Sequence, residues 1–106
     1  MEEYWVSHKR KDEKDIRIER VKAMEKKQEG GLKSGKEYTR SQVVDSIEDT
    51  ENNNRWITCK FNRKEGDTTY WDPGEEIHVY RTDNDAFIRT DRNETEEDNL
   101  GDLPDF

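Results

Sequence analysis

The sequence is poor in the residues that build large hydrophobic cores. Only 27% of its 106 residues are hydrophobic, and three of them are leucines. Leu, Ile, Val and Phe together number 17, which is below the roughly 20% at which a highly charged chain is expected to be disordered. Three tryptophans and four tyrosines argue against disorder, because disordered chains contain few aromatic residues. The spacing of the apolar residues therefore decides whether the chain folds.

Other absences exclude whole classes of protein. The single cysteine, Cys59, excludes an intrachain disulfide and gives no sign of an oxidising compartment. No apolar run approaches the roughly 18 residues of a membrane span, and residues 1–11 lack the apolar stretch of a signal peptide. We therefore expect a cytoplasmic protein without membrane contact.

Charged residues are abundant and unevenly distributed. The formal net charge is −8, and residues 1–40 carry 12 Lys and Arg against 9 Asp and Glu, whereas residues 41–106 carry 7 against 18. A small acidic protein repels phosphate at long range, so nucleic acid is disfavoured as a partner. The basic first third leaves a weak local contact with nucleic acid open.

Alternating apolar residues predict five strands. They cover residues 4–10, 16–24, 55–61, 77–80 and 86–90. In the second strand the alternation slips after Ile18, and a bulge near residues 19–20 would return Val21 and Ala23 to the core side. A helical turn at that point is the competing interpretation.

Residues 38–50 carry the helix signal. Thr39 is the expected N-cap, and Gln42 has the spacing of a capping box. Tyr38 and Val43 have the spacing of a hydrophobic staple. Val44 and Ile47 extend the apolar stripe begun by Val43. A helix this short must pack against the rest of the protein to be stable.

The chain between these elements is expected to form loops. The two longest are residues 25–37 and 62–75, both rich in charge and glycine. Residues 1–106 then form a single α+β domain, with a mostly antiparallel sheet of about five strands and one helix packed on one face.

The acidic tail, residues 91–106, holds its own apolar residues. Leu100, Leu103 and Pro104 follow the last strand at a spacing that suits a turn folded back on the core. Burying two leucines would contribute roughly 3–6 kcal/mol before the entropy of ordering, so the tail is predicted to be part of the fold.

The end of the chain also carries a signature that resembles a known family. The signature has an aromatic-aliphatic-Arg-Thr sequence, a polar stretch, Asn-Leu and then Leu-Pro. It comprises Phe87, Ile88, Arg89, Thr90, Asn99, Leu100, Leu103 and Pro104. With "WVSHKRKD", "YTRSQVVDSIE" and "IHVYRT", it resembles a small prokaryotic family of uncharacterised proteins, domain of unknown function 3892. This resemblance implies a domain identity and supplies no catalytic residue.

Metal and catalytic motifs are weak in this sequence. Asp91, Asn93 and Thr95 match the first ligands of a calcium loop, but Glu96 stands where the loop needs glycine and Asp102 where it needs glutamate. A solvated acidic loop is therefore favoured.

Candidate metal ligands elsewhere are single residues. His8, His78 and Cys59 lie on different predicted strands without the spacing of a metal site. Cys59 shares its inward parity with Ile57 and Phe61, which favours an inert buried thiol over a nucleophile. We therefore predict no catalytic residue, no cofactor and no metal.

Aromatic and basic residues form the candidate interaction surface. It comprises Tyr4, Trp5, Lys9, Arg10, Trp56, Tyr70 and Trp71. The competing interpretation is that Trp5 and Trp56 pack as a cross-strand pair in the core. Arg89 is interpreted as a clamp that binds Asp91 or Asp98, with an anion-binding arginine as the alternative.

Three functional hypotheses remain. The favoured one is a non-enzymatic protein-interaction or accessory module with a protein partner. The second is a weak nucleic-acid binder that uses the basic, aromatic N-terminal third. The third is an enzyme with an unrecognised carboxylate or thiol site. The sequence does not decide between a monomer and a homodimer.

Overall fold

The computed structural model describes residues 2–14, 17–91 and 98–106. These residues form seven strands and one helix. In chain order they are β1 (Glu3–Lys11), β2 (Ile18–Glu25), β3 (Lys36–Thr39), α1 (Arg40–Glu48), β4 (Arg55–Glu65), β5 (Thr68–Glu76), β6 (His78–Arg81) and β7 (Ala86–Arg89).

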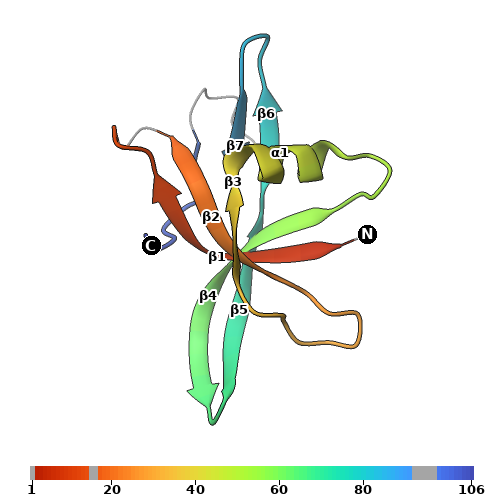
Figure 1. Ribbon diagram of the computed structural model, residues 1–106, viewed down its shortest axis with the longest axis vertical. Coiled ribbons are helices and arrows are strands. Elements are labelled where there is room, and N and C mark those ends of the chain that lie inside the picture. The colour runs from red at the N-terminus through yellow and green to blue at the C-terminus, as the bar shows by residue number, and fades with distance from the viewer. Residues whose placement is uncertain (1, 15–16, 92–97) are drawn as a thin grey trace.

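Five strands form one sheet in the order β3-β2-β1-β4-β5, and β6 pairs with β7 in a separate hairpin. The β1–β4 pair is parallel, and every other pair of neighbouring strands is antiparallel. The β4–β5 and β6–β7 hairpins project from opposite ends of the molecule (Figure 1). The predicted α+β fold, with a mostly antiparallel five-stranded sheet and one helix, is confirmed.

The predicted bulge in the second strand is confirmed. Arg10 pairs with Arg20 and Lys11 pairs with Ile18, so Glu19 is the extra residue of β2. Ile18, Val21 and Ala23 are all buried. The helical-turn alternative is therefore wrong at this position.

A second bulge, in β1, was not predicted. Val6 pairs with Ala23 and His8 pairs with Lys22, so Ser7 is the extra residue of β1. Strict alternation would place His8 on the side of Val6, but Trp5, Ser7 and His8 all line one groove. The bulge reverses the alternation of β1 and so moves His8 to the side of Trp5.

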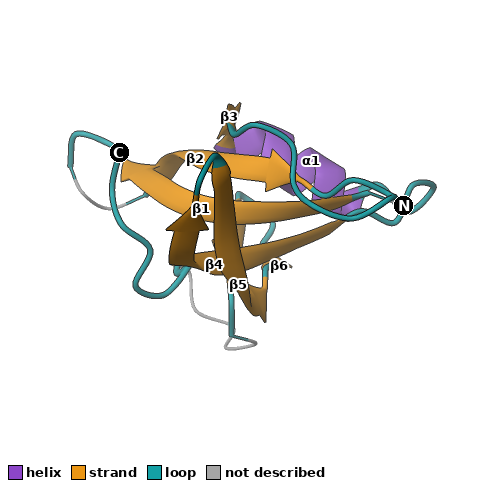
Figure 2. Ribbon diagram, turned by 90° about the horizontal axis from the view of Figure 1, so that it is seen from below, coloured by secondary structure: helices purple, strands orange, loops and turns teal. Residues whose placement is uncertain are grey.

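Helix α1 begins as predicted. Thr39 Oγ1 accepts a hydrogen bond from the Gln42 amide at 3.2 Å, and Gln42 Oε1 accepts one from the Thr39 amide at 2.8 Å. This capping box satisfies two backbone donors at the start of the helix. Val43 and Val44 are buried beneath the helix, which covers one face of the sheet over β2 and β3 (Figure 2).

The expectation of a loop at residues 62–75 is wrong. These residues complete the β4–β5 hairpin, which turns at Gly66 with φ of 60°. Polar residues occupy both faces of this hairpin, so no apolar alternation marked it as strand. Phe61, expected to face inward, is 59% exposed, because β4 extends beyond the packed layers here. The last residues of the expected loop 25–37 are also strand, because β3 begins at Lys36.

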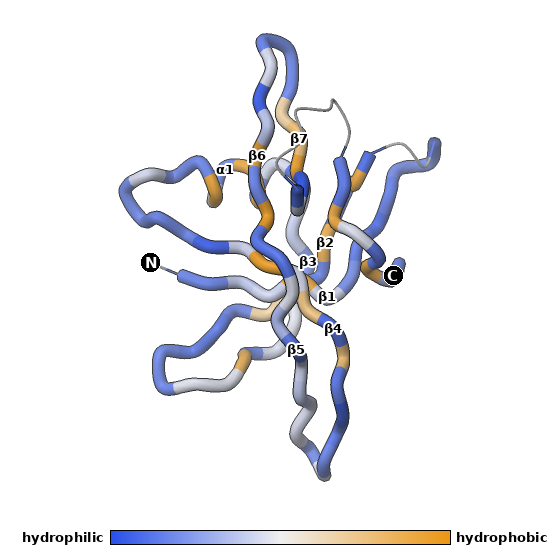
Figure 3. Tube along the Cα trace, turned by 180° about the vertical axis from the view of Figure 1, so that it is seen from behind, coloured by the Kyte–Doolittle hydropathy of each residue, from blue (hydrophilic) through white to orange (hydrophobic). Residues whose placement is uncertain are grey.

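The core is centred on Trp56. Its indole stacks on the Tyr4 ring with centroids 4.2 Å apart, and Tyr38 meets it edge-on at 5.2 Å. The Trp56 Nε1 donates to Ser46 Oγ on α1 at 2.9 Å, so its polar atom is satisfied. Apolar residues gather where the strands cross, and the tips of the two projecting hairpins carry hydrophilic ones (Figure 3).

The predicted return of the tail is confirmed. Leu100 and Leu103 are buried. The Lys9 amide donates to the Pro104 carbonyl at 2.9 Å, and the Phe106 amide donates to the Lys9 carbonyl at 3.2 Å. The end of the chain thus pairs with the first strand.

Candidate functional site

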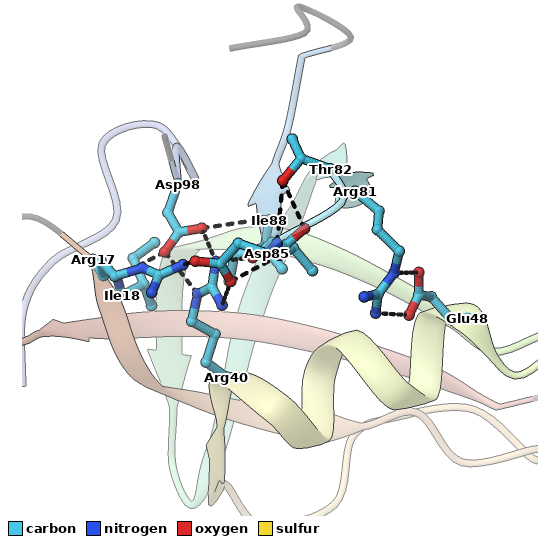
Figure 4. Close-up of polar contacts among 10 residues, drawn as sticks. Arg17, Ile18, Arg40, Glu48, Arg81, Thr82, Asp85, Ile88 and Asp98 are labelled. Carbon is cyan, nitrogen blue, oxygen red and sulfur yellow. Dashed lines mark hydrogen bonds and ion pairs between the residues drawn. The ribbon is translucent and has the colours of Figure 1, made fainter. Parts of the chain in front are cut away.

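Asp98 is the centre of a buried polar cluster. Its side chain is 1% exposed. It accepts hydrogen bonds from the backbone amides of Ile18 and Ile88, both at 3.0 Å. Arg40 donates to the two carboxylate oxygens from Nε at 2.9 Å and from a terminal nitrogen at 2.8 Å (Figure 4). One carboxylate therefore joins β2, β7 and the first residue of α1.

The surrounding residues complete this cluster. Arg40 also donates to the carbonyl of Ala86, and Arg17 forms an ion pair with Asp85. Both guanidinium groups lie over the ring of Phe87, at 5.4 Å for Arg17 and 5.6 Å for Arg40. Because these groups already have protein partners, we assign the cluster a structural role.

Arg89 binds Asp91, one of the two carboxylates that the clamp hypothesis named. Its side chain is 6% exposed. It holds Asp91 with two hydrogen bonds of 2.8 and 3.1 Å. The clamp partner is thus Asp91, whereas Asp98 pairs with Arg40. The paired, buried guanidinium does not fit the alternative of an anion-binding arginine in an open groove.

The thiol does not have the features of a nucleophile. Cys59 is buried, with Sγ 3.4 Å from the carbonyl oxygen of Val6. Burial raises the pKa of the Cys59 thiol to about 12. A reactive cysteine instead needs a lowered pKa and access to solvent.

The candidate metal ligands are dispersed in the structure. Within residues 2–14, 17–91 and 98–106, no three His, Cys, Asp or Glu residues form a group that could hold a metal ion. Most of the calcium-loop motif, including Asn93, Thr95 and Glu96, lies outside the described residues. His8 contacts Ser7 Oγ through Nδ1 at 2.8 Å, and His78 lies 3.8 Å from Glu76.

A groove of about 770 Å³ lies between the β2–β3 connection and the tip of the β4–β5 hairpin. Both segments project beyond the body of the sheet toward the same end of the molecule (Figure 1). Strands β1 and β2 form its floor. The groove is lined by Trp5, Ser7, His8, Lys22, Met24, Lys26, Lys27, Gly31, Leu32, Lys33, Ser34, Gly35, Asp67, Thr68, Thr69, Tyr70 and Trp71.

The groove is basic although the protein is acidic. Four lysines line it against one aspartate, whereas the whole chain has a formal charge of −8. Lys33 and Lys26 are partly neutralised, by Glu25 at 2.6 Å and Glu3 at 3.6 Å. Among the described residues, no ion pair is found for Lys22 or Lys27. These two ammonium groups are therefore the strongest candidates to attract an anion.

Aromatic rings occupy two sides of the groove. The Trp5 ring is held by a neighbour on its own strand, because its Nε1 donates to Glu3 Oε2 at 2.8 Å. This hydrogen bond lowers the pKa of Glu3, with further help from Lys26 and Arg55. Across the groove, Trp71 meets Phe61 edge-on at 5.9 Å.

His8 adds a flat ring beside these aromatics. Burial and the positive charge of Lys22 lower the pKa of His8. A lowered pKa favours the neutral form of the imidazole. His8 therefore adds little to the positive charge that the lysines give the groove.

The predicted interaction residues separate into three groups. Tyr4 and Trp56 pack in the core, and burial together with Glu2 raises the pKa of the Tyr4 hydroxyl. Trp5 faces the groove, so the expected Trp5–Trp56 pair is replaced by Tyr4–Trp56. A separate group is formed by Lys9 and Arg10, which bind the tail through the carbonyls of Gly101 at 3.1 Å and Phe106 at 2.9 Å. The groove group comprises Trp5, Tyr70 and Trp71.

Sequence reasoning missed the groove lysines. Lys26, Lys27 and Lys33 lie in the segment predicted to be a loop, and Lys22 lies on β2. The four lysines within 25–37 were the available signal. Their meaning depends on Tyr70 and Trp71, which come close only through the unpredicted hairpin.

Comparisons with known proteins identify the family of this chain. A search of curated proteins and a search of solved structures found no match. Among the described residues, the single helix has nine residues. It is not long and apolar enough to cross a membrane. The family model described as "Protein of unknown function (DUF3892)" matches residues 5–104. The chain therefore belongs to the DUF3892 family.

Proposed function

We propose that this protein is a non-enzymatic binding module and that its ligand, which is anionic, occupies the basic, aromatic groove. The observation that carries the proposal is the gathering of four lysines and three large aromatic side chains in one concave surface of an acidic protein. Concave sites lined by aromatic residues with a few charged groups are the usual form of ligand sites.

The groove is also suited to binding because its floor is part of the hydrogen-bonded central sheet. Trp5, Ser7 and Lys22 lie on paired strands of the central sheet, and the Trp5 ring is held by Glu3. Side chains fixed before binding lose little conformational entropy when a ligand arrives. The local positive charge attracts an anion at short range, where the −8 charge of the whole molecule is screened by salt.

The test is a titration of the protein with two anionic probes, a single strand of about 12 thymidines and a peptide of about the same number of glutamates. Tryptophan fluorescence reports binding, because two of the three tryptophans line the groove. The variant Lys22→Gln/Lys27→Gln should weaken binding of whichever probe binds. Lys60→Gln/Lys64→Gln is the matched control, since both lysines are exposed and lie outside the groove. Binding of neither probe, or equal loss in both variants, would contradict the proposal.

A protein partner at the edge of the sheet is the second candidate. Strand β5 is an edge of the sheet, and the exposed large side chains Phe61 (59%) and Tyr70 (40%) lie on the β4–β5 hairpin. An open edge strand is a template for an added strand from a partner. A pull-down whose captured protein is lost with Phe61→Ser, and kept with the control Tyr80→Ser, would favour this candidate.

A further inference from the structure

We propose that the anion bound in the groove is a segment of single-stranded nucleic acid, an inference that rests on the proposed binding function. The unpaired bases stack on Trp71, Tyr70 and Trp5, and the phosphates are bound by Lys22 and Lys27. The chemistry behind this assignment is the combination of ring faces and point charges in one groove.

The aromatic residues favour bases over carboxylates. The face of an aromatic ring carries partial negative charge, so it offers nothing to the carboxylates of an acidic peptide. A nucleobase stacks on such a face with little dependence on its identity. The Arg63 guanidinium lies over one face of the Tyr70 ring, 4.4 Å from its centroid, which places a further cation next to the groove.

The positive residues favour phosphates spaced along a flexible chain. Lys22 lies on the sheet floor and Lys27 on the opposing connection. Lysine binds phosphate as a point charge without a fixed angle. This tolerance suits a mobile sugar-phosphate backbone better than a ligand of one fixed geometry.

The size of the groove favours unpaired bases. Its volume of about 770 Å³ is in the range of small-ligand sites, roughly 300–1,000 Å³, so bases enter singly. In a duplex the ring faces are stacked on neighbouring pairs and are not available to Trp71 or Tyr70. Strand separation is therefore a requirement for binding.

The overall charge sets the expected strength. At most four lysines of the groove meet phosphates, which gives a slope of log affinity against log salt no steeper than about −3. The formal charge of −8 opposes approach of the polyanion at low salt, so the observed slope should be shallower than that limit.

The experiment compares four probes by tryptophan fluorescence and by electrophoretic mobility. They are a thymidine strand of about 12 nucleotides, the same strand without bases, the corresponding duplex, and a glutamate peptide of about equal length. The thymidine strand should bind at least about tenfold more tightly than each of the others and should quench tryptophan emission.

Two variants separate stacking from charge. Trp71→Leu removes a ring face and keeps an apolar side chain, so it should weaken binding of the thymidine strand by about tenfold and leave the strand without bases unaffected. Tyr80→Leu is the matched control, because Tyr80 stacks on Phe87 in the β6–β7 hairpin, away from the groove. Thermal unfolding of each variant confirms that it is folded.

The outcomes distinguish this inference from the proposed function. Equal binding of strands with and without bases, tighter binding of the duplex, or groove-dependent binding of the glutamate peptide alone would overturn the nucleic-acid assignment and leave the binding function intact. If no probe binds, both the assignment and the binding function fail.

Discussion

The two faces of β1 differ in what their side chains contact. Tyr4 and Val6 lie in the packed core, where Tyr4 stacks on Trp56. Trp5 and His8 line the open groove. In the Asp98 cluster on the closed side, charges meet protein partners at hydrogen-bond distance. On the groove side, Lys22 and Lys27 are exposed and have no ion pair among the described residues, so their charge is available to a ligand.

Removing the tail should have the largest effect on the closed face. Ending the chain after Asp98 deletes Leu100, Leu103 and the backbone pairing with Lys9. The loss of buried apolar area alone is about 3–6 kcal/mol, comparable with the whole stability of a small domain. We expect the truncated protein to unfold, with collapse of amide dispersion in its NMR spectrum. The matched control is deletion of Phe106 alone, and an unchanged spectrum after the longer truncation would contradict the prediction.

Replacing one tryptophan on each face by alanine should show how differently the two faces contribute to stability. Trp56 is 2% exposed at the core centre, so Trp56→Ala should cost about 3–5 kcal/mol in urea unfolding. Trp71 is partly exposed at the groove, so Trp71→Ala should cost less than about 1 kcal/mol. Equal losses in the two variants would show that the groove face is part of the core.

The buried carboxylate should show a slightly smaller effect. Asp98→Asn removes the negative charge opposite Arg40 and replaces one acceptor oxygen by a donor. The cost should be about 3 kcal/mol, the lower end for a broken buried ion pair, because Arg40 keeps 17% side-chain exposure. Asp102→Asn is the control on the same segment, exposed to solvent. If Asp98→Asn lowered the free energy of unfolding by less than about 0.5 kcal/mol, the cluster would not contribute to stability as predicted.

The smallest predicted effect concerns alkaline pH. Burial raises the pKa of Cys59 to about 12, whereas an unfolded thiol titrates near pH 8.5. The folded state then keeps a proton that the unfolded chain loses, so stability falls as pH rises above about 9. At about pH 10 the titration of Cys59 in the unfolded chain lowers the free energy of unfolding by about 1–2 kcal/mol. Urea unfolding of Cys59→Ala should lack this part of the decline, and an identical pH dependence in both proteins would contradict it.

Local sequence patterns predicted the parts of the fold that depend on near neighbours. The capping box needs only Thr39 and Gln42, three residues apart. The Glu19 bulge follows from a slip in alternation that only an extra residue repairs. Leu100 and Leu103 are the only large apolar residues among described residues 98–103, so their burial could be inferred.

Features that depend on distant partners were missed. The Ser7 bulge leaves no trace in the alternation of β1, yet it moves His8 to the groove. Arg40 and Asp98 are 58 residues apart, and each alone resembles any surface charge. The groove requires the β2–β3 connection and the β4–β5 hairpin to meet, which no local pattern encodes.

The pairing of the tail with β1 has a consequence for how the chain folds. The hydrogen bond from the Lys9 amide to the Pro104 carbonyl closes nearly the whole chain into one loop. The Ile18 amide likewise finds its acceptor only in Asp98. During synthesis the first strands therefore leave the ribosome long before the residues that complete them. Such distant contacts slow folding, so the nascent protein acquires its native core only after residues 98–106 have emerged.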